Sequence, residues 1–327
     1  QGWPLCAELG AVCGQQGMAI TWPHGAAWRS IVLYALCSSV MLVINKVTIS
    51  RVPLPGVVFC IQFLTTFLAI VVGKRTGHLE VDDLKAHTVL RFSPYAAAFV
   101  ASVFLNGKVL QNSNVETLIT FRACSPLFVS VLDWAFLGRM FPAPRSLIAL
   151  VGVSIGAVGY VLCDSEFKMR GAAAYGWVSA YLVVIIFEMT YAKHTISSIR
   201  FESPVWGSVL YTNALAIGPM GALAVASGEL SRTAEVRLDA RTAQVLLACC
   251  ILGIGMNWSG WNCRDQISAA SYTLLGVACK FISVLLNVLI WDKHATPAGI
   301  AWLSVCLLCS SLYRQAPLRA DHKRDDS

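Results

Sequence analysis

Ten apolar stretches in this chain are each long enough to cross a lipid bilayer as a helix. A hydrocarbon core ~30 Å thick needs about 20 apolar residues in helical form. Two of the stretches, 203–228 and 242–263, contain no charged residue at all. Charged residues make up only 13% of the chain, whereas soluble domains carry about 25%. We therefore predict an all-α integral membrane protein with ten transmembrane helices. The expected spans lie near 28–47, 55–73, 93–111, 115–137, 145–163, 174–192, 204–227, 242–261, 269–291 and 297–314.

The ten spans divide into two sets of five, which suggests an internal repeat. A shift of 154 residues aligns 114–160 with 268–314 without a gap, in hydropathy and length more than in identity. Repeats with an odd number of spans insert in opposite directions, and in secondary transporters the substrate site lies at the midplane between them. We expect inverted five-helix repeats at 28–163 and 171–314.

Short segments flank the two repeats. Segment 1–27 begins with Gln1 rather than Met and is expected to be truncated or disordered, and 315–327 forms a C-terminal tail. An even number of spans places both termini on one side. The loops on that side carry more Lys and Arg than the loops opposite. The positive-inside rule therefore predicts that both termini are cytosolic.

Lys280 lies near the middle of the ninth predicted span and is the only charged residue between Ala269 and Trp291. Tyr272, Gly276 and Lys280 follow one another at spacings of four, which stacks them on one helical face. A cation at membrane depth costs about 2.5–3.5 kcal/mol on insertion scales. The missing side chain at Gly276 leaves room for a ligand beside the ammonium group. This pattern favours an anion-binding site, and the alternative is a lysine paired with a buried carboxylate.

Arg122 is a second central cation, in the fourth span. A guanidinium group can bind a phosphate through two parallel hydrogen bonds. It can equally form an ion pair with Glu188 of the sixth span, and the residues leave both interpretations open. In the repeat alignment Arg122 matches Gly276, one helical turn from Lys280. The other ionisable residues assigned to the spans or their ends are Lys46, Lys108, Asp133 and Lys193.

The seventh span places a phenol, Tyr211, and an amide, Asn213, inside an otherwise apolar helix. An Asn side chain donates and accepts hydrogen bonds at once, which matches the edge of a purine base. The alternative is that these groups only hydrogen-bond one helix to another. We interpret them as candidates for a base-binding pocket.

Enzymatic and metal-dependent functions find little support. Cys306 and Cys309 form a C-x-x-C, but they lie inside an apolar span without a second pair or a nearby His. Phosphate-binding loops, zinc-protease motifs and nucleophile elbows are missing. The net charge of +7 is spread over the loops rather than gathered in a block. We predict no enzyme activity, no cofactor and no metal, and no nucleic-acid partner.

Three stretches resemble the GDP-mannose transporter family of nucleotide-sugar transporters, in the drug/metabolite transporter superfamily. They are Asn114 to Arg122, Gly156 to Tyr160 continuing to Asp164-Ser165, and Trp291 to His294. The likeness covers roughly residues 28 to 314 and is strongest to the plant and algal branch. It implies ten helices and a Golgi antiporter that exchanges cytosolic GDP-mannose or GDP-L-galactose for lumenal GMP. It also leaves a second copy of the chain as a candidate partner.

Two family motifs can be matched by position. The guanine-reading F-Y-N-N motif matches Leu210 to Asn213, with the Tyr and the last Asn kept and Thr212 in place of Asn. The G-A-L-N-K motif matches Gly276 to Lys280, with Cys279 in place of Asn. The resemblance implies Lys280 as the phosphate ligand and Tyr272 near the sugar and phosphate.

Two rival functions remain. A sugar-phosphate or triose-phosphate antiporter of the same superfamily would need more cations around a smaller anion and no base pocket. A polytopic transferase or a membrane scaffold is a more remote alternative.

Overall fold

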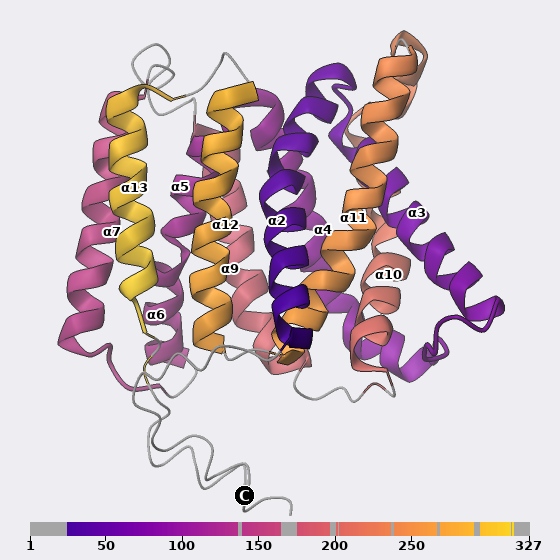
Figure 1. Ribbon diagram of the computed structural model, residues 1–327, viewed down its shortest axis with the longest axis horizontal. Coiled ribbons are helices and arrows are strands. Elements are labelled where there is room, and N and C mark those ends of the chain that lie inside the picture. The colour runs from indigo at the N-terminus through magenta and orange to yellow at the C-terminus, as the bar shows by residue number, and fades with distance from the viewer. Residues whose placement is uncertain are drawn as a thin grey trace, which may run out of the picture.

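The computed structural model describes residues 25–136, 139–164, 175–196, 201, 203–236, 239–266, 269–290, 295–314 and 316. These residues form a bundle of α-helices without any strand (Figure 1). The elements are α2 (Gly25–Arg51), α3 (Pro55–Arg75), α4 (Ala86–Asn112), α5 (Val115–Ala123), α6 (Ser125–Phe136), α7 (Pro144–Cys163), α9 (Gly176–Ile196), α10 (Pro204–Ala226), the short 3₁₀ helix η2 (Leu230–Glu235), α11 (Ala240–Gln266), α12 (Ala269–Ile290) and α13 (Pro297–Leu312). Nearly all of segment 1–27 and of the tail 315–327 lies outside the described residues.

The helices confirm an all-α membrane protein. Among the described residues, 7 helices are long and apolar enough to cross a membrane. The shorter apolar helices Gly176–Glu188, Leu275–Ile290 and Pro297–Leu312 lie at the sixth, ninth and tenth predicted spans. Large apolar side chains cover the outside of the bundle, as a lipid-facing surface requires; examples are Leu36, Val72, Ile148, Val183 and Leu289.

The fourth predicted span is not one continuous helix. It divides at Cys124 into α5 and α6, and the Cys124 amide donates to the Phe121 carbonyl at 3.0 Å. Pro126 contributes to this break because it has no amide hydrogen to donate and its ring crowds the preceding turn. By contrast, Pro94 lies inside the unbroken helix α4, which begins at Ala86, earlier than the hydropathy pattern indicates.

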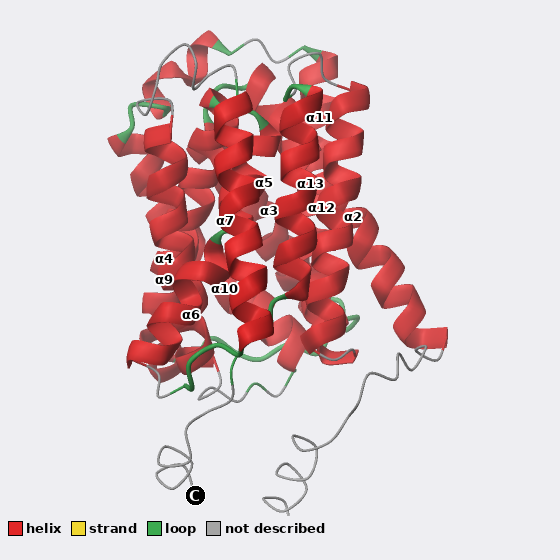
Figure 2. Cartoon of the chain, turned by 90° about the vertical axis from the view of Figure 1, so that its left-hand side faces the viewer, coloured by secondary structure: helices red, strands yellow, loops and turns green. Residues whose placement is uncertain are grey.

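Helices from the two halves of the chain pack against each other. The most extensive contacts join α2 with α11, α7 with α13, α4 with α9, and α3 with α10. The start of α2 and the end of α13 lie at the same end of the bundle, as an even number of spans requires (Figures 1 and 2).

Glycines permit the close contact between α7 and α13. A Cβ atom on Gly156 would lie 2.7 Å from the backbone nitrogen of Cys306. Gly152 and Gly159 face Cys309 and the ring of Trp302 in the same way. These glycines are therefore packing positions, as small residues often are between membrane helices.

Polar side chains tie the helices together at the end opposite the termini. The Glu229 carboxylate is 1% exposed and accepts a hydrogen bond from Lys108 Nζ at 2.6 Å. It also accepts from the Gly56 amide at 2.7 Å, at the N-terminus of α3. Lys46 donates to the carbonyl of Ser113 at 2.7 Å. Lys46 and Lys108, two of the three lysines assigned to spans or their ends, therefore have structural partners.

Candidate functional site

Lys280 and Gly276 lie on α12 beside open space. Apart from its chain neighbours and the adjacent backbone of its own helix, no atom of the described residues lies within 4 Å of the position that a Cβ on Gly276 would occupy. Lys280, one turn later, is partly buried. None of the ion pairs among the described residues joins Lys280 to a carboxylate. A buried lysine–carboxylate pair therefore finds no support in this part of the chain.

Arg122 lies on α5. Its depth in the bundle relative to Lys280 follows from a hydrogen bond between Glu116 of α5 and Asn287 of α12. Asn287 Nδ2 of α12 donates to Glu116 Oε1 of α5 at 2.8 Å, and both side chains are buried. The two helices run in opposite directions. Arg122 is six residues beyond Glu116, ~9 Å along α5, and Lys280 is seven residues before Asn287, ~10.5 Å along α12. The two cations therefore lie at nearly the same depth.

The surroundings of Arg122 fit an anion site. It lies in the last turn of α5 and its side chain is exposed, although the helix itself is largely buried. Its guanidinium group acts electrostatically on Lys280, with the same sign of charge. Arg122 and Glu188 both act on the hydroxyl of Tyr181 as well, which leaves the ion pair between Arg122 and Glu188 as an open alternative. The side chain of Asp133 lies outside the described residues.

Asn213 is a fully buried side chain near the middle of α10. Its Nδ2 donates to the Val209 carbonyl at 2.8 Å, one turn earlier in the same helix. Its Oδ1 accepts no hydrogen bond from the described residues. A buried acceptor left without a donor costs about 1–3 kcal/mol. A ligand that donates a hydrogen bond to Asn213 Oδ1 would remove this cost.

Tyr211 is committed to a different set of contacts. Its hydroxyl donates to the Asp83 carbonyl at 2.9 Å and accepts from the Lys85 amide at 2.7 Å. Its ring packs between those of Phe92 and Phe201. Positions two apart on a helix point about 200° away from each other. The structure therefore does not bring Tyr211 and Asn213 to one surface, and Tyr211 fastens α10 to the segment before α4.

The remaining predicted site residue, Tyr272, belongs to α12, but its side chain lies outside the described residues. Two residues that the sequence reasoning missed are Glu116 and Asn287. A lone carboxylate at the start of an apolar span was the available signal for Glu116. Asn287 carried a weaker signal, an amide in the ninth span.

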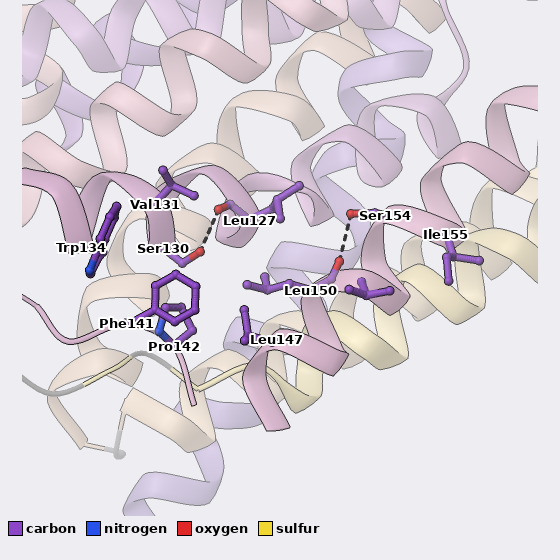
Figure 3. Close-up of a pocket in the computed structure, with 11 residues that line it drawn as sticks. Leu127, Ser130, Val131, Trp134, Phe141, Pro142, Leu147, Leu150, Ser154 and Ile155 are labelled. Atoms are coloured by element: carbon purple, nitrogen blue, oxygen red, sulfur yellow. Dashed lines mark hydrogen bonds between the residues drawn. The ribbon is translucent and has the colours of Figure 1, made fainter. Parts of the chain in front are cut away.

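A second hollow lies between α6 and α7 and has a different chemistry. Its volume is about 320 Å³, and apolar side chains including Val131, Leu147 and Ile155 line it (Figure 3). The hydroxyls of Ser130 and Ser154 donate to carbonyls of their own helices at 2.8 and 3.0 Å. None of the described residues that line this hollow is charged, so it is unsuited to a charged ligand.

Comparison with known proteins gives two close matches over most of the chain. The chain is 36% identical over 301 residues to GDP-fucose transporter 1 of Arabidopsis thaliana, covering 89% of this chain and 86% of that protein. It is 33% identical over 316 residues to the GDP-mannose transporter GONST3 of the same plant, covering 91% and 83%. No protein-family model matches.

The fold also has a counterpart among solved structures. One crystal structure aligns with a TM-score of 0.53 and 13% identity, covering 88% of this chain and 95% of the other. At that identity the likeness concerns the fold.

Proposed function

The chain belongs to the nucleotide-sugar transporter family, a family of transporters and not of enzymes, and we propose that it is an antiporter that exchanges a GDP-sugar for GMP. The names of the two plant relatives, a GDP-fucose and a GDP-mannose transporter, favour a guanine nucleotide sugar. GDP-mannose and GDP-L-galactose, which the resemblance to the plant and algal branch implies, are candidates together with GDP-fucose. The Golgi membrane is the proposed location, with cytosolic GDP-sugar entering and lumenal GMP leaving.

The observation that carries this proposal is the pairing of two cations at one depth. Glu116 and Asn287 hold α5 against α12, which places Arg122 level with Lys280. Two like charges at membrane depth repel each other and are costly to bury. The anionic diphosphate of a nucleotide sugar would relieve both costs, because each cation could bind phosphate oxygens.

The base end of the substrate is assigned to Asn213. Helix α10 packs on α3, α4 and α11, whereas α12 packs on α2, α5, α11 and α13. A ligand that contacts both Asn213 and Lys280 has to reach across the bundle. A nucleotide sugar is long enough to do so, and a triose phosphate is much shorter. Tyr211 then supports the site by holding α10 in place, and Tyr272 is assigned to the sugar and phosphate by the resemblance to the family.

The helix contacts favour two inverted repeats as the basis of alternating access. Let α2, α3, α4, α5–α6 and α7 correspond in order to α9, α10, α11, α12 and α13. Exchanging the two sets converts the α2–α11 contact into α9–α4 and the α2–α12 contact into α9–α5. The α3–α10 and α7–α13 contacts convert into themselves. This is the pattern of a two-fold axis between the halves, and the drug/metabolite transporter fold has such halves.

Obligatory exchange follows from the charge of the empty site. With no anion bound, the Lys280 ammonium group would oppose reorientation of the carrier through the membrane. Bound GMP or GDP-sugar removes that barrier, so only the loaded carrier changes sides. An empty carrier that reorients as fast as a loaded one would contradict this coupling.

The test is uptake into proteoliposomes that contain the purified full chain and are preloaded with GMP. Labelled GDP-fucose, GDP-mannose, GDP-L-galactose and UDP-galactose are compared, with Lys280→Ala as the variant. Lys74→Ala serves as the matched control, because Lys74 pairs with Asp83 at the surface. We expect GDP-sugar uptake that requires both internal GMP and Lys280 and that survives in the control. Exchange of phosphate or triose phosphate without any nucleotide sugar would favour the rival carrier instead.

A further inference from the structure

Tyr181 on α9 has a buried hydroxyl that forms no hydrogen bond with the described part of the chain. The side chain is 1% exposed, and its oxygen has no partner among the described residues. Other buried tyrosines of the same region are satisfied. Tyr175 donates to Asp164 Oδ2 at 2.6 Å, and Tyr160 shares a hydrogen bond of 2.9 Å with Thr117. Buried polar groups are nearly always paired, so an orphaned hydroxyl calls for an explanation.

The groups around this hydroxyl come from three helices. Asn106 on α4 and Arg122 on α5 lie close to this hydroxyl without meeting hydrogen-bond geometry, and the Glu188 carboxylate further along α9 acts on it electrostatically. Helix α9 packs against both α4 and α5, so these side chains converge on one region of the bundle. Arg122 is the cation that the proposed function assigns to a phosphate group.

A phenol is suited to complete such a site. Its O–H group can donate a hydrogen bond to an anionic oxygen, and such charge-assisted bonds are about twice as strong as neutral ones. A hydroxyl that only supported the fold would already have a protein partner, as Tyr175 has. The absence of an acceptor among the described residues is consistent with a hydroxyl whose acceptor is supplied by the substrate.

We propose that the Tyr181 hydroxyl donates a hydrogen bond to the phosphate group that Arg122 binds. Helix α9 thereby becomes the third wall of the anion site, opposite α12. This assignment rests on the proposed function, because it takes the phosphate of GMP and of the GDP-sugar as the ligand. The rival is a structural network in which Tyr181 only orients Arg122 and Glu188.

The experiment measures thermal unfolding and nucleotide binding of the purified full chain in detergent, with GMP, GDP and inorganic phosphate as probes. Tyr181→Phe removes one oxygen atom and keeps the ring. We expect the midpoint without ligand to stay unchanged, because no protein hydrogen bond is lost. The Kd for GMP and GDP should rise about 10-fold or more, the loss expected for one hydrogen bond to a charged group.

Tyr175→Phe is the matched control, near the start of the same helix. It removes a buried hydrogen bond to Asp164, so the midpoint without ligand should fall while the Kd for GMP stays unchanged. Should Tyr181→Phe fail to fold, Asn106→Ala tests the same site from α4, with a raised Kd expected.

The outcomes separate the two levels of the argument. Tyr181→Phe that binds GMP as the wild type does, or that loses stability as Tyr175→Phe does while keeping its affinity, overturns the assignment and leaves the proposed function standing. A wild-type chain that binds inorganic phosphate but no guanine nucleotide overturns both.

Discussion

The Glu229 carboxylate should contribute more to stability than the Lys108 ammonium group that pairs with it. Glu229 receives hydrogen bonds from Lys108 Nζ at 2.6 Å, from the Gly56 amide at 2.7 Å and from the Val57 amide at 3.3 Å. Its side chain is 1% exposed and that of Lys108 is 13% exposed. One carboxylate thus connects the end of α10 with α3 and α4.

The two single substitutions leave different groups without partners. Glu229→Ala strands a nearly buried ammonium group and uncaps the N-terminus of α3. Removing one partner of a buried pair costs about 3–5 kcal/mol, so we expect a loss of about 4 kcal/mol. Lys108→Met leaves the carboxylate with two amide donors at the positive end of a helix dipole. One lost hydrogen bond to a charged group costs about 2 kcal/mol.

The assay is equilibrium unfolding in mixed detergent micelles of the wild type, both single variants and the double variant. The double-mutant cycle should give a coupling energy of about 2 kcal/mol, typical of residues in direct contact. Arg232→Ala is the control, because Arg232 forms an exposed pair with Glu235 at 3.8 Å, and it should cost less than about 0.5 kcal/mol. Equal losses in the two single variants, or a larger loss in Lys108→Met, would refute the reasoning.

Three further predictions follow from local geometry. Gly276→Leu should block GDP-sugar uptake without lowering the unfolding midpoint, since space is open there, whereas Gly156→Leu should lower the midpoint by forcing α7 away from the backbone of α13. Tyr211→Phe should lower the free energy of unfolding by about 1–3 kcal/mol, because the Asp83 carbonyl and the Lys85 amide lose their hydrogen-bond partner. The affinity for GMP should stay unchanged. A selective loss of GMP affinity would instead place Tyr211 at the base. The hydrogen bond and charge from Lys74 lower the pKa of Asp83 below 3.8, so the contact is complete above that pH and is lost as the pH falls through the lower folded value. Carboxyl NMR titration should show the Asp83 pKa rising toward 3.8 in Lys74→Ala, and an unchanged value would contradict the pairing.

Local chemistry along the chain was sufficient to predict the helices. A lipid core demands about 20 apolar residues per helix, so stretches such as 242–263 are recognisable without any neighbour. The gap at Gly276 beside Lys280 was equally readable, because positions four apart share a helical face whatever surrounds them. The break at Cys124 escaped the hydropathy pattern because hydropathy measures apolar length and not the direction of the backbone. Pro126 was its only local sign.

Tertiary structure alone decided which polar groups meet. The sequence marked Arg122 and Lys280 as central, but their common depth depends on the contact between Glu116 and Asn287, which are 171 residues apart. It grouped Tyr211 with Asn213 by proximity along the chain, whereas the fold turns Tyr211 toward Asp83 and leaves the Asn213 oxygen unsatisfied. It marked Lys108 only as an ionisable residue in a span or at its end, whereas the fold supplies Glu229 as its partner. Periodicity along one helix specifies which face is apolar, and it contains no information about which distant helix that face will meet.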